Sequence, residues 1–540
     1  MMPGIVSLMR LRSAALLTAV LAFALTAVAS GAPTRWPPVN GPGEVFVHMG
    51  EEHLDDPDGA TIYPRAISDA ILFKPDLVVT AGDKTSNGTE ANLLSWKEAM
   101  SAFDRAGIPY FAGVGNHDRA ALPGFPNGIS PLSPLGPYLT TFADRPYPFG
   151  DSPPISDPKF SPKTRPADDP AGASSHYFFD YGNVRWILLD NSCYEFEICD
   201  KSQNPPFEDG NTSFGFLEKA ATEAGKAGKV VFVSLHMPTQ DPRPEHSQPT
   251  PQPHTFGEGA SSENTTFEDA AAKDGVDGVF PAHIKGQWIY TAQKVPYYID
   301  GGAGGAVYVG SSEQVGVDYG YWHGFRVIRV DGQKITTDAV PIYVPGGITM
   351  TAPAPAKVGD EVTLAATGRQ PTKNGPSLEK FEIRSPDPKR PNFENLPDPA
   401  RIWTTSNRFV AGPVPVKDDD ARRNPKTQTK GGVFRATCPG DAKMTITSGV
   451  ESAAQTLHVS SAPGKIVRSI VPGSRSVRVT LAQPAVVDVK VRSGERYKRV
   501  RRTCFAGGAK PQVTRVPPGS SVRVIVTSDR KPVTRDLTAG

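Results

Sequence analysis

Residues of the types that bind metal ions recur along this chain at the ends of short apolar segments. They are Glu51, His53, Asp83, Asn116, His117, His236 and His283. Carboxylate oxygens, an amide oxygen and imidazole nitrogens together form a donor set suited to zinc, iron or manganese. A single carboxylate such as Asp83 can bridge two ions, and paired ions activate a water molecule for in-line attack on phosphorus. The pattern therefore predicts a metal-dependent hydrolytic site.

The segments that carry these residues follow the pattern of an α/β fold. Apolar strands are expected at 45–47, 76–80, 110–114, 184–189, 229–235 and 278–280. Between the second and the third, Leu93, Trp96, Met100 and Phe103 have helical spacing. Open sheets build their sites where strands end. We therefore expect the polar residues that follow these strands to lie together.

The motifs resemble those of the calcineurin-like metallophosphoesterase family, which includes purple acid phosphatases and cyclic-nucleotide phosphodiesterases. The family pattern is DxH, GD, GNH followed by Asp or Glu, a lone His, and GHxH. This chain has EEH at 51–53, GD at 82–83, GNHD at 115–118, the lone His236, and AHIK at 282–285. Segments 178–190 and 298–305 also look like the family. The resemblance covers residues 43–345 and implies a two-sheet sandwich flanked by helices.

The resemblance also implies two adjacent metal sites that share one aspartate. The ligands of one ion would be Asp83, Asn116, His236 and His283. The ligands of the other would be Glu51, His53, Asp83 and the residue at position 285. His117 would protonate the leaving oxygen or stabilise charge on it, with Asp118 orienting the ring of His117.

Two residues depart from the family pattern. Glu51 stands where the family has an aspartate, and Lys285 stands where it has a second metal-binding histidine. A protonated lysine has no lone pair to give to a metal. Three outcomes stay open: water replaces the lost ligand and two ions bind; one ion binds and the Lys285 ammonium supplies the other positive charge; or the domain is inactive and only binds. Retention of His117 favours activity.

Composition adds loops and β-rich modules to this picture. Pro and Gly contribute 54 and 52 of the 540 residues, while the 38% hydrophobic content excludes wholesale disorder. Segments 123–170 and 238–253 hold 13 and 6 prolines and leave directly from polar strand ends. Loops of this length are often functional. We expect both to act as lids over the site.

The chain after the α/β region is expected to be all-β. Residues 349–460 resemble a bacterial immunoglobulin-like module of group 2, on the stretches VGDEVTL at 358–364, IWTTSN at 402–407 and PGDAKMTI at 439–446. Trp403 would be the core aromatic of that sandwich. Strict alternation at 486–491 and 521–527 predicts half-buried strands in a last domain, residues 463–540.

The formal net charge of +2 conceals an asymmetry. Residues 463–540 hold 17 Lys and Arg against 4 Asp and Glu, and the remainder holds 41 against 52. The basic domain suits an anionic cell-envelope polymer as a partner, with a solvated charged face as the plain alternative. Nucleic acid is disfavoured because the domain lacks an aromatic stacking pattern.

The first 32 residues read as a signal peptide, with arginines at 10 and 12, an apolar run at 14–29 and a small-residue cleavage site. We therefore expect a secreted or cell-envelope protein without a transmembrane span in its mature form. Four cysteines allow three pairings. We favour Cys193 with Cys199 and Cys438 with Cys504, because the other two pairings would link the α/β region to the all-β part of the chain.

The sequence thus predicts an exported phosphoesterase that hydrolyses phosphate mono- or diesters with one or two divalent ions. Its catalytic groups would be His117, Asp118 and Lys285. The alternative is a catalytically inactive protein of the same fold that acts as a surface-binding or adhesion protein.

Overall fold

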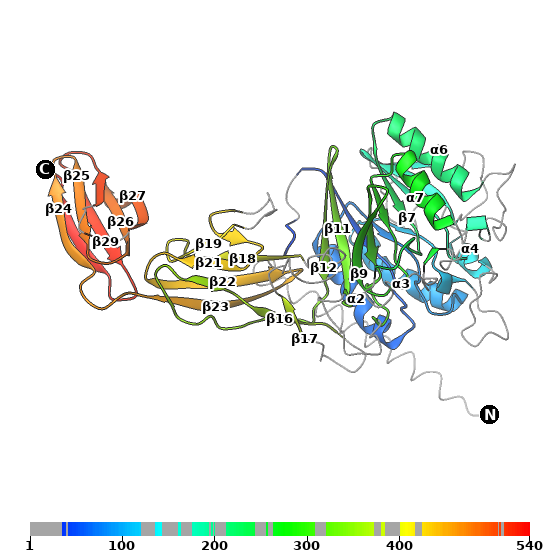
Figure 1. Cartoon of the computed structure of the whole chain (residues 1–540), viewed down its shortest axis with the longest axis horizontal. Helices are drawn as coiled ribbons and strands as arrows, with labels where there is room; N and C mark the ends of the chain where they lie inside the picture. Colours follow the sequence, from blue (N-terminus) through cyan, green and yellow to red (C-terminus); the bar gives the residue numbers. More distant parts are fainter. Residues whose placement is uncertain are drawn as a thin grey trace, which may run out of the picture.

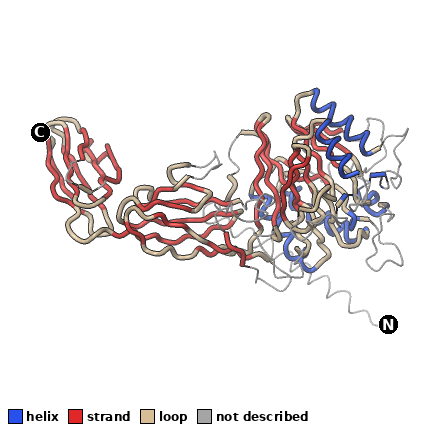
Figure 2. Tube along the Cα trace, viewed as in Figure 1, coloured by secondary structure: helices blue, strands red, loops and turns tan. Residues whose placement is uncertain are grey.

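The computed structural model shows an elongated molecule with three parts in a row (Figure 1). It describes residues 35–38, 42–119, 135–142, 160–163, 175–193, 196–197, 199, 212–242, 255–256, 263–307, 320–371, 380–383, 400–415, 424–505, 507–508 and 512–540. The predicted signal peptide and most of the two proline-rich segments lie outside these residues. Helices are confined to the part at one end, and the other two parts are built from strands (Figure 2).

The helical part contains two sheets. In the first, within the described residues, five strands lie in the order β12 (Lys334–Pro341), β11 (Gly324–Asp331), β1 (Glu44–Met49), β2 (Leu77–Thr80) and β3 (Tyr110–Ala112). The β1, β2 and β3 strands run parallel, so that their carboxyl ends share one edge. The sequence predicted all three of these strands, which are short and mostly apolar because both faces are covered.

The second sheet has seven strands among the described residues. Their order is β4 (Phe160–Lys163), β5 (Tyr177–Tyr181), β6 (Val184–Leu188), β7 (Val230–Ser234), β8 (Gly278–Phe280), β10 (Val295–Asp300) and β9 (Gln287–Ala292). The β6, β7 and β8 strands run parallel. Their carboxyl ends therefore also lie at one edge of this sheet.

Aromatic side chains fill the space between the two sheets. The ring of Trp186 on β6 meets Phe46 on β1 edge to face, with the ring centroids 5.9 Å apart. Phe111 on β3 stacks on Phe179 of β5, with the centroids 3.6 Å apart. Such pairs bury large apolar areas and add about 0.5–1.5 kcal/mol each beyond area burial. The two sheets therefore form one sandwich.

Helices cover the outer faces of the sandwich. On the first sheet lie α2 (Pro57–Leu72), α3 (Glu90–Arg105) and α4 (Gly136–Phe142), and on the second lie α6 (Ser213–Lys226) and α7 (Glu263–Lys273). In α3, the predicted helical stripe of Leu93, Trp96, Met100 and Phe103 is buried. Thr89 caps this helix by accepting a hydrogen bond from the backbone N–H of Asn92. The predicted sandwich flanked by helices is confirmed.

The rest of the chain is rich in β-strands, as predicted. We call residues 349–460 the middle β-region; its strands are β13 (Thr349–Met350), β14 (Ala356–Lys357), β15 (Glu361–Thr363), β16 (Ala366–Arg369), β17 (Lys380–Ile383), β18 (Arg401–Thr405), β19 (Ala411–Pro413), β20 (Gln428–Thr429), β21 (Val433–Ala436), β22 (Gly440–Ser448) and β23 (Glu451–Ser460). Trp403 is fully buried in its apolar core. The immunoglobulin-like assignment and the domain boundaries stay predictions.

The last part has its own core. We call residues 463–540 the C-terminal β-region; its strands are β24 (Val467–Gly473), β25 (Ser476–Leu481), β26 (Ala485–Ser493), β27 (Arg496–Phe505), β28 (Gln512–Arg515), β29 (Ser521–Thr527) and β30 (Val533–Thr538). One sheet has the order β24-β25-β28 and the other β27-β26-β29-β30. Of the described helices in the whole molecule, none is long and apolar enough to span a membrane.

The cysteine prediction is half right. A disulfide joins Cys438 to Cys504, as predicted. The predicted bond between Cys193 and Cys199 is wrong, because both are buried cysteines outside any disulfide in the described structure. The backbone N–H of Cys193 donates to Sγ of Cys199 at 3.0 Å, and the Arg119 guanidinium lies 3.8 Å from the same sulfur.

Candidate metal centre

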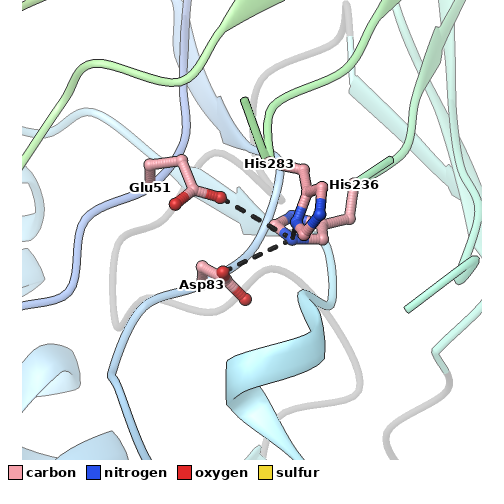
Figure 3. A group of neighbouring side chains, drawn as sticks. All are labelled: Glu51, Asp83, His236 and His283. Carbon is pink, nitrogen blue, oxygen red and sulfur yellow. Dashed lines mark hydrogen bonds and ion pairs between the residues drawn. The ribbon is translucent and has the colours of Figure 1, made fainter. Parts of the chain in front are cut away.

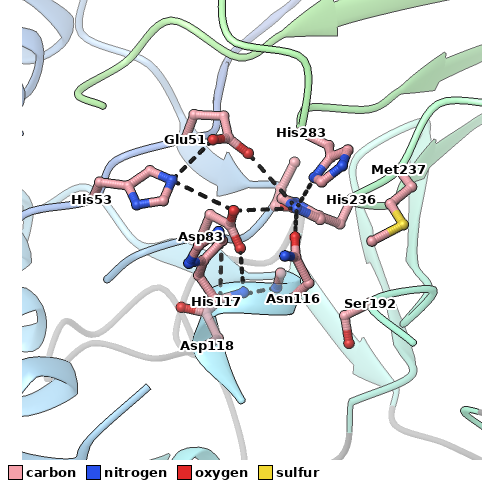
Figure 4. A network of polar contacts seen from close by, with 12 residues as sticks. Glu51, His53, Asp83, Asn116, His117, Asp118, Ser192, His236, Met237 and His283 are labelled. Atoms are coloured by element: carbon pink, nitrogen blue, oxygen red, sulfur yellow. Dashed lines mark hydrogen bonds and ion pairs between the residues drawn. The ribbon is translucent and has the colours of Figure 1, made fainter. Parts of the chain in front are cut away.

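The polar residues singled out in the sequence gather where the edges of the two sheets meet (Figure 4). Those that follow strands of the first sheet are Glu51, His53, Asp83, Asn116, His117 and Asp118. Those that follow strands of the second sheet are His236, His283 and Lys285. Parallel strands place their carboxyl ends at a common edge. Chain segments up to 234 residues apart in sequence thereby supply one site.

The backbone turns sharply at this edge. Four of the site residues have positive φ angles of 41–60°, which side chains other than glycine rarely adopt: Glu51, His53, Asp83 and His283. At Gly82 the φ angle is 103°, and an added Cβ would collide with the backbone nitrogen of Gly115. The His53 N–H donates to the Asp83 carbonyl at 2.9 Å, which holds the two turns together.

One imidazole nitrogen lies at the centre of the first group of donors. The donor atoms of four buried residues all lie within 4.8 Å of one another: Glu51, Asp83, His236 and His283 (Figure 3). From Nε2 of His236, the Nδ1 of His283 is 3.1 Å away and the Oδ1 of Asn116 is 2.8 Å away. The nearest carboxylate oxygens of Asp83 and Glu51 lie at 3.4 and 3.6 Å. A single ring nitrogen cannot hydrogen-bond to all of them.

The protonation of His236 explains why these donors suit a cation. Its Nδ1 lies 3.0 Å from the Ala81 carbonyl oxygen, and a carbonyl oxygen can only accept, so Nδ1 carries a hydrogen. In the neutral ring, Nε2 then carries a lone pair and no hydrogen, and it faces another ring nitrogen and three oxygens. A bound cation would satisfy these donors together, and a backbone carbonyl on the far ring nitrogen is the usual support of a metal-binding histidine.

The Asp83 carboxylate is in its charged form. Burial by itself would raise the pKa of Asp83, but the neighbouring His236 and His117 outweigh it and hold that pKa well below its ordinary range. A carboxylate, an amide oxygen and two imidazoles form a fitting set for zinc, iron or manganese. The residues Asp83, Asn116, His236 and His283 therefore fit a divalent ion.

A second group lies beside the first and differs in character. Nε2 of His53 is 3.0 Å from one Glu51 oxygen and 3.5 Å from Asp83, and the Lys285 ammonium is 3.9 Å from the same Glu51 oxygen. Burial alone would lower the pKa of His53, but the hydrogen bonds to Asp83 and Glu51 raise it to about 10. This half of the site already contains a fixed positive charge in Lys285, which a second metal ion would have to face.

The longer side chain of Glu51 connects the two groups. One of its oxygens faces His53 and Lys285, and the other faces His236. With a side chain one methylene shorter, an aspartate at this position would not extend as far toward His236. The replacement noted in the sequence thus lets residue 51 contact both halves of the site.

The structure gives Asp118 a different task from the predicted one. Its carboxylate accepts hydrogen bonds from the backbone N–H groups of Asp83, Lys84 and Gly115 at 2.8–3.0 Å, and it forms a buried ion pair with the Lys84 ammonium at 3.0 Å. The prediction that Asp118 orients the ring of His117 is therefore wrong. Asp118 instead joins the loops after β2 and β3.

The ring of His117 is held by another loop. Its Nδ1 donates to the carbonyl oxygen of Ser86 at 2.9 Å, and its backbone N–H donates to Asp83 at 2.8 Å. The residue is half-buried in the middle of the short 3₁₀ helix η2 (Asn116–Asp118). The loop that carries Ser86 therefore positions the ring of His117.

Three supporting residues were not singled out from the sequence. Oδ1 of Asn191 accepts the backbone N–H groups of His236 and Met237 at 2.9 and 3.0 Å and so fixes the loop that carries the lone histidine. Asp300 on β10 pairs with His48 of β1 at 2.9 Å and thereby ties the two sheets together. Ser86 contacts His53 as well as His117. Asn191 closely follows the predicted strand at 184–189, so its position at a strand end could have identified it from the sequence.

Comparison with known proteins agrees with this geometry. Residues 46–286 match the family model of the calcineurin-like phosphoesterases. The two-sheet part of the chain therefore matches that family, and the resemblance drawn from the motifs is confirmed. No curated protein matches the chain.

Several solved structures are similar to the chain at low sequence identity. The purple acid phosphatase PPD1 of yellow lupin (Lupinus luteus) is 12% identical, with 64% of this chain and 55% of the lupin chain covered and a TM-score of 0.37. A putative 5'-nucleotidase from Staphylococcus aureus is 14% identical, with 59% and 61% covered and a TM-score of 0.33. GAP50, the anchor in the inner membrane complex of Plasmodium, is 14% identical, with 56% and 85% covered and a TM-score of 0.32. The family assignment rests on the family model alone.

Proposed function

We propose that this chain is a metal-dependent phosphoesterase that hydrolyses phosphate mono- or diesters. The observation that carries the proposal is the convergence of Asp83, Asn116 and His283 on Nε2 of His236, in a domain of the calcineurin-like phosphoesterase family. A bound divalent ion would supply an activated water molecule and neutralise charge on the phosphate. Zinc, iron and manganese all suit these donors.

The remaining polar residues have separate tasks in this proposal. His117 exchanges a proton with the leaving oxygen through Nε2, because Nδ1 is held by Ser86. The Lys285 ammonium, 12% exposed and beside Glu51, donates hydrogen bonds to a phosphate oxygen. One resident ion together with Lys285 then provides the positive charges that would otherwise come from two ions.

We further propose that the protein is exported and that its basic C-terminal β-region holds it to an anionic polymer of the cell envelope. The signal-like first 32 residues and the 17 basic against 4 acidic residues at 463–540 support this location. The competing proposal is an inactive protein of the same fold that only binds at the surface. Retention of His117 favours the enzyme, and so does retention of the four family ligands Asp83, Asn116, His236 and His283.

Metal analysis and a simple hydrolysis assay separate the two proposals. The mature chain is expected to bind zinc, iron or manganese and to hydrolyse an aryl phosphate monoester or diester. Asp83→Ala and His283→Ala should lower both metal content and kcat/KM, the latter by about 100-fold or more, because each removes a ligand. A wild-type chain with no bound metal, and no activity above these two controls, would exclude the enzyme.

A further inference from the structure

Three positive side chains stand side by side on the sheet made of β27, β26, β29 and β30. In its register, Lys490 on β26 lies opposite Arg499 of β27 on one side and Arg523 of β29 on the other. Directly opposite residues point to the same face of a sheet. That face is the outer one, because Val489 and Val491, the neighbours of Lys490, pack in the core.

A bulge in β27 decides which further arginine lies on this outer face. The pairing of β26 with β27 shifts by one residue, which leaves Val500 without a directly opposite residue. On either side of it, Arg499 and Arg502 lie opposite Lys490 and Asp488, whose side chains both point outward. A bulge changes which face the following side chains reach. Here it places Arg502, rather than Arg501, on the same face as Arg499.

The face remains positive after its ion pairs are counted. Asp488 accepts hydrogen bonds from Arg499 at 2.9 and 3.1 Å, and Asp536 accepts from Arg523 at 2.7 and 2.9 Å. Lys490 forms no ion pair with any residue that the structure describes. The cations of the face are Lys490, Arg492, Arg499, Arg502 and Arg523. Five cations against two carboxylates leave three positive charges in excess.

Such a row is not what the stability of the sheet alone would favour. Like charges directly opposite each other on neighbouring strands destabilise a sheet. The outer face of the other sheet, around β25, shows no such row: Arg478 lies opposite Val471 and Val513. The aspartates that pair with Arg499 and Arg523 offset only part of this repulsion, and an anion lying across the row would remove more of it.

We infer that this face, the outer face of β27, β26 and β29, binds a flexible polymer that carries phosphate groups along its length. Neighbouring strands are about 4.8 Å apart, so the row of three cations spans about 10 Å, more than a single phosphate group covers. Four of the five cations are arginines, whose planar guanidinium groups bind phosphate through two parallel hydrogen bonds. The inference rests on the proposed attachment to an anionic polymer but not on catalysis.

The same face is poorly suited to single-stranded nucleic acid. Proteins that bind it combine positive charge with aromatic rings on which the bases stack. Among the described residues of this face, Tyr497 is the one with an aromatic ring, and it lies opposite Arg492. The guanidinium of Arg523 already covers it, 4.4 Å from the ring centroid.

Binding of long-chain inorganic polyphosphate to the full chain tests the inference. Lys490→Gln/Arg492→Gln removes two charges from the face, and the matched control Arg478→Gln/Arg515→Gln removes two exposed charges from the opposite sheet. We expect the first pair to weaken binding about tenfold and to lower the salt dependence of log K by about two, and the control to change affinity less than about twofold. Equal losses in both pairs would show that only net charge matters and would overturn the inference.

Further measurements separate ligand binding from folding and from catalysis. Lys490→Arg should bind polyphosphate like wild type, and the unfolding midpoint of Lys490→Gln should be unchanged or raised, because the repulsion is relieved. Loss of binding in Lys490→Arg, or a lower midpoint in Lys490→Gln, would contradict the inference. So would equal or tighter binding to polyglutamate, single-stranded DNA or anionic lipid vesicles. Asp83→Ala should bind normally, so that a failure of catalysis leaves this result unchanged.

Discussion

The residue at position 285 decides the character of half of the site. A histidine there would face Glu51 and His53 as a neutral donor, whereas the Lys285 ammonium faces them as a charge 3.9 Å from a Glu51 oxygen. The space beside Glu51 and Asp83 suits a cation, because both side chains are buried carboxylates. We therefore propose that the ammonium takes the place of a second ion rather than helping to bind one.

This reasoning predicts the effect of restoring a donor. Lys285→His is expected to raise the metal content from about one to about two ions per chain, because Glu51, His53 and Asp83 are already in place. Elemental analysis of the purified chain measures it. Lys285→Gln, which removes the charge without adding a ring nitrogen, is the control and should stay near one. An unchanged content in Lys285→His would mean that the longer Glu51 also prevents the second site.

At the scale of elements, a partly buried ion cluster joins the sandwich to the middle β-region. Arg65 on α2 pairs with Asp69 one turn later at 2.9 Å and with Glu451 at the start of β23 at 3.0 Å. Burial raises the pKa of Asp69 to about 7; Arg65 opposes this shift and Glu451 adds to it. The contact between the two parts of the chain thus contains a carboxyl group that is protonated in acid and charged in base.

The sign of the resulting pH dependence follows from linkage. Because the pKa of Asp69 is higher in the folded chain, its protonation stabilises the fold at low pH, and that contribution is lost as the pH rises toward about 7. Asp69→Asn should remove this loss. We expect the variant to gain about 1 kcal/mol or more in free energy of unfolding relative to wild type between pH 5 and pH 8. Denaturant unfolding at both pH values measures it, and parallel behaviour of the two chains would contradict it.

At the scale of the whole molecule, covalent and aromatic contacts connect the two β-regions. The Cys438–Cys504 disulfide links the segment between β21 and β22 to β27. Beside it, the guanidinium of Arg502 lies 5.7 Å from the ring centroid of Phe409 in the middle β-region. In the linker, Arg530 donates to the carbonyl of Ala462 at 2.9 Å. The phosphate-binding face is thereby held at the far end of the molecule from the metal centre (Figure 1).

Removal of this disulfide has a predictable effect on stability. Its cysteines are 66 residues apart, and closing a loop of that length lowers the entropy of the unfolded chain by an amount worth about 4 kcal/mol. Cys438→Ser/Cys504→Ser should therefore lower the free energy of unfolding of the β-regions by up to that value. Denaturant unfolding followed by circular dichroism measures it. Wild type under reducing conditions is the matched control, and an oxidised wild type no more stable than the variant would refute the prediction.

The sequence by itself determined the family, the strand ends that carry the donors and the buried stripe of α3. These follow from local patterns, namely apolar runs, helical spacing and short motifs, and neighbouring residues are enough to produce them. The rule that sites form where strands end also located Asp83, Asn116, His236 and His283. Neighbouring parallel strands bring their carboxyl ends to one edge of a sheet.

Only the tertiary structure decided how these pieces contact one another. The task of Asp118, the role of Glu51 between the two groups, and the absence of a bond between Cys193 and Cys199 in the described residues all depend on distances between separate loops. The row of Lys490, Arg499 and Arg523 depends on strand register and on one bulge. Register and loop approach are set by packing of the whole chain, so no local pattern specifies them.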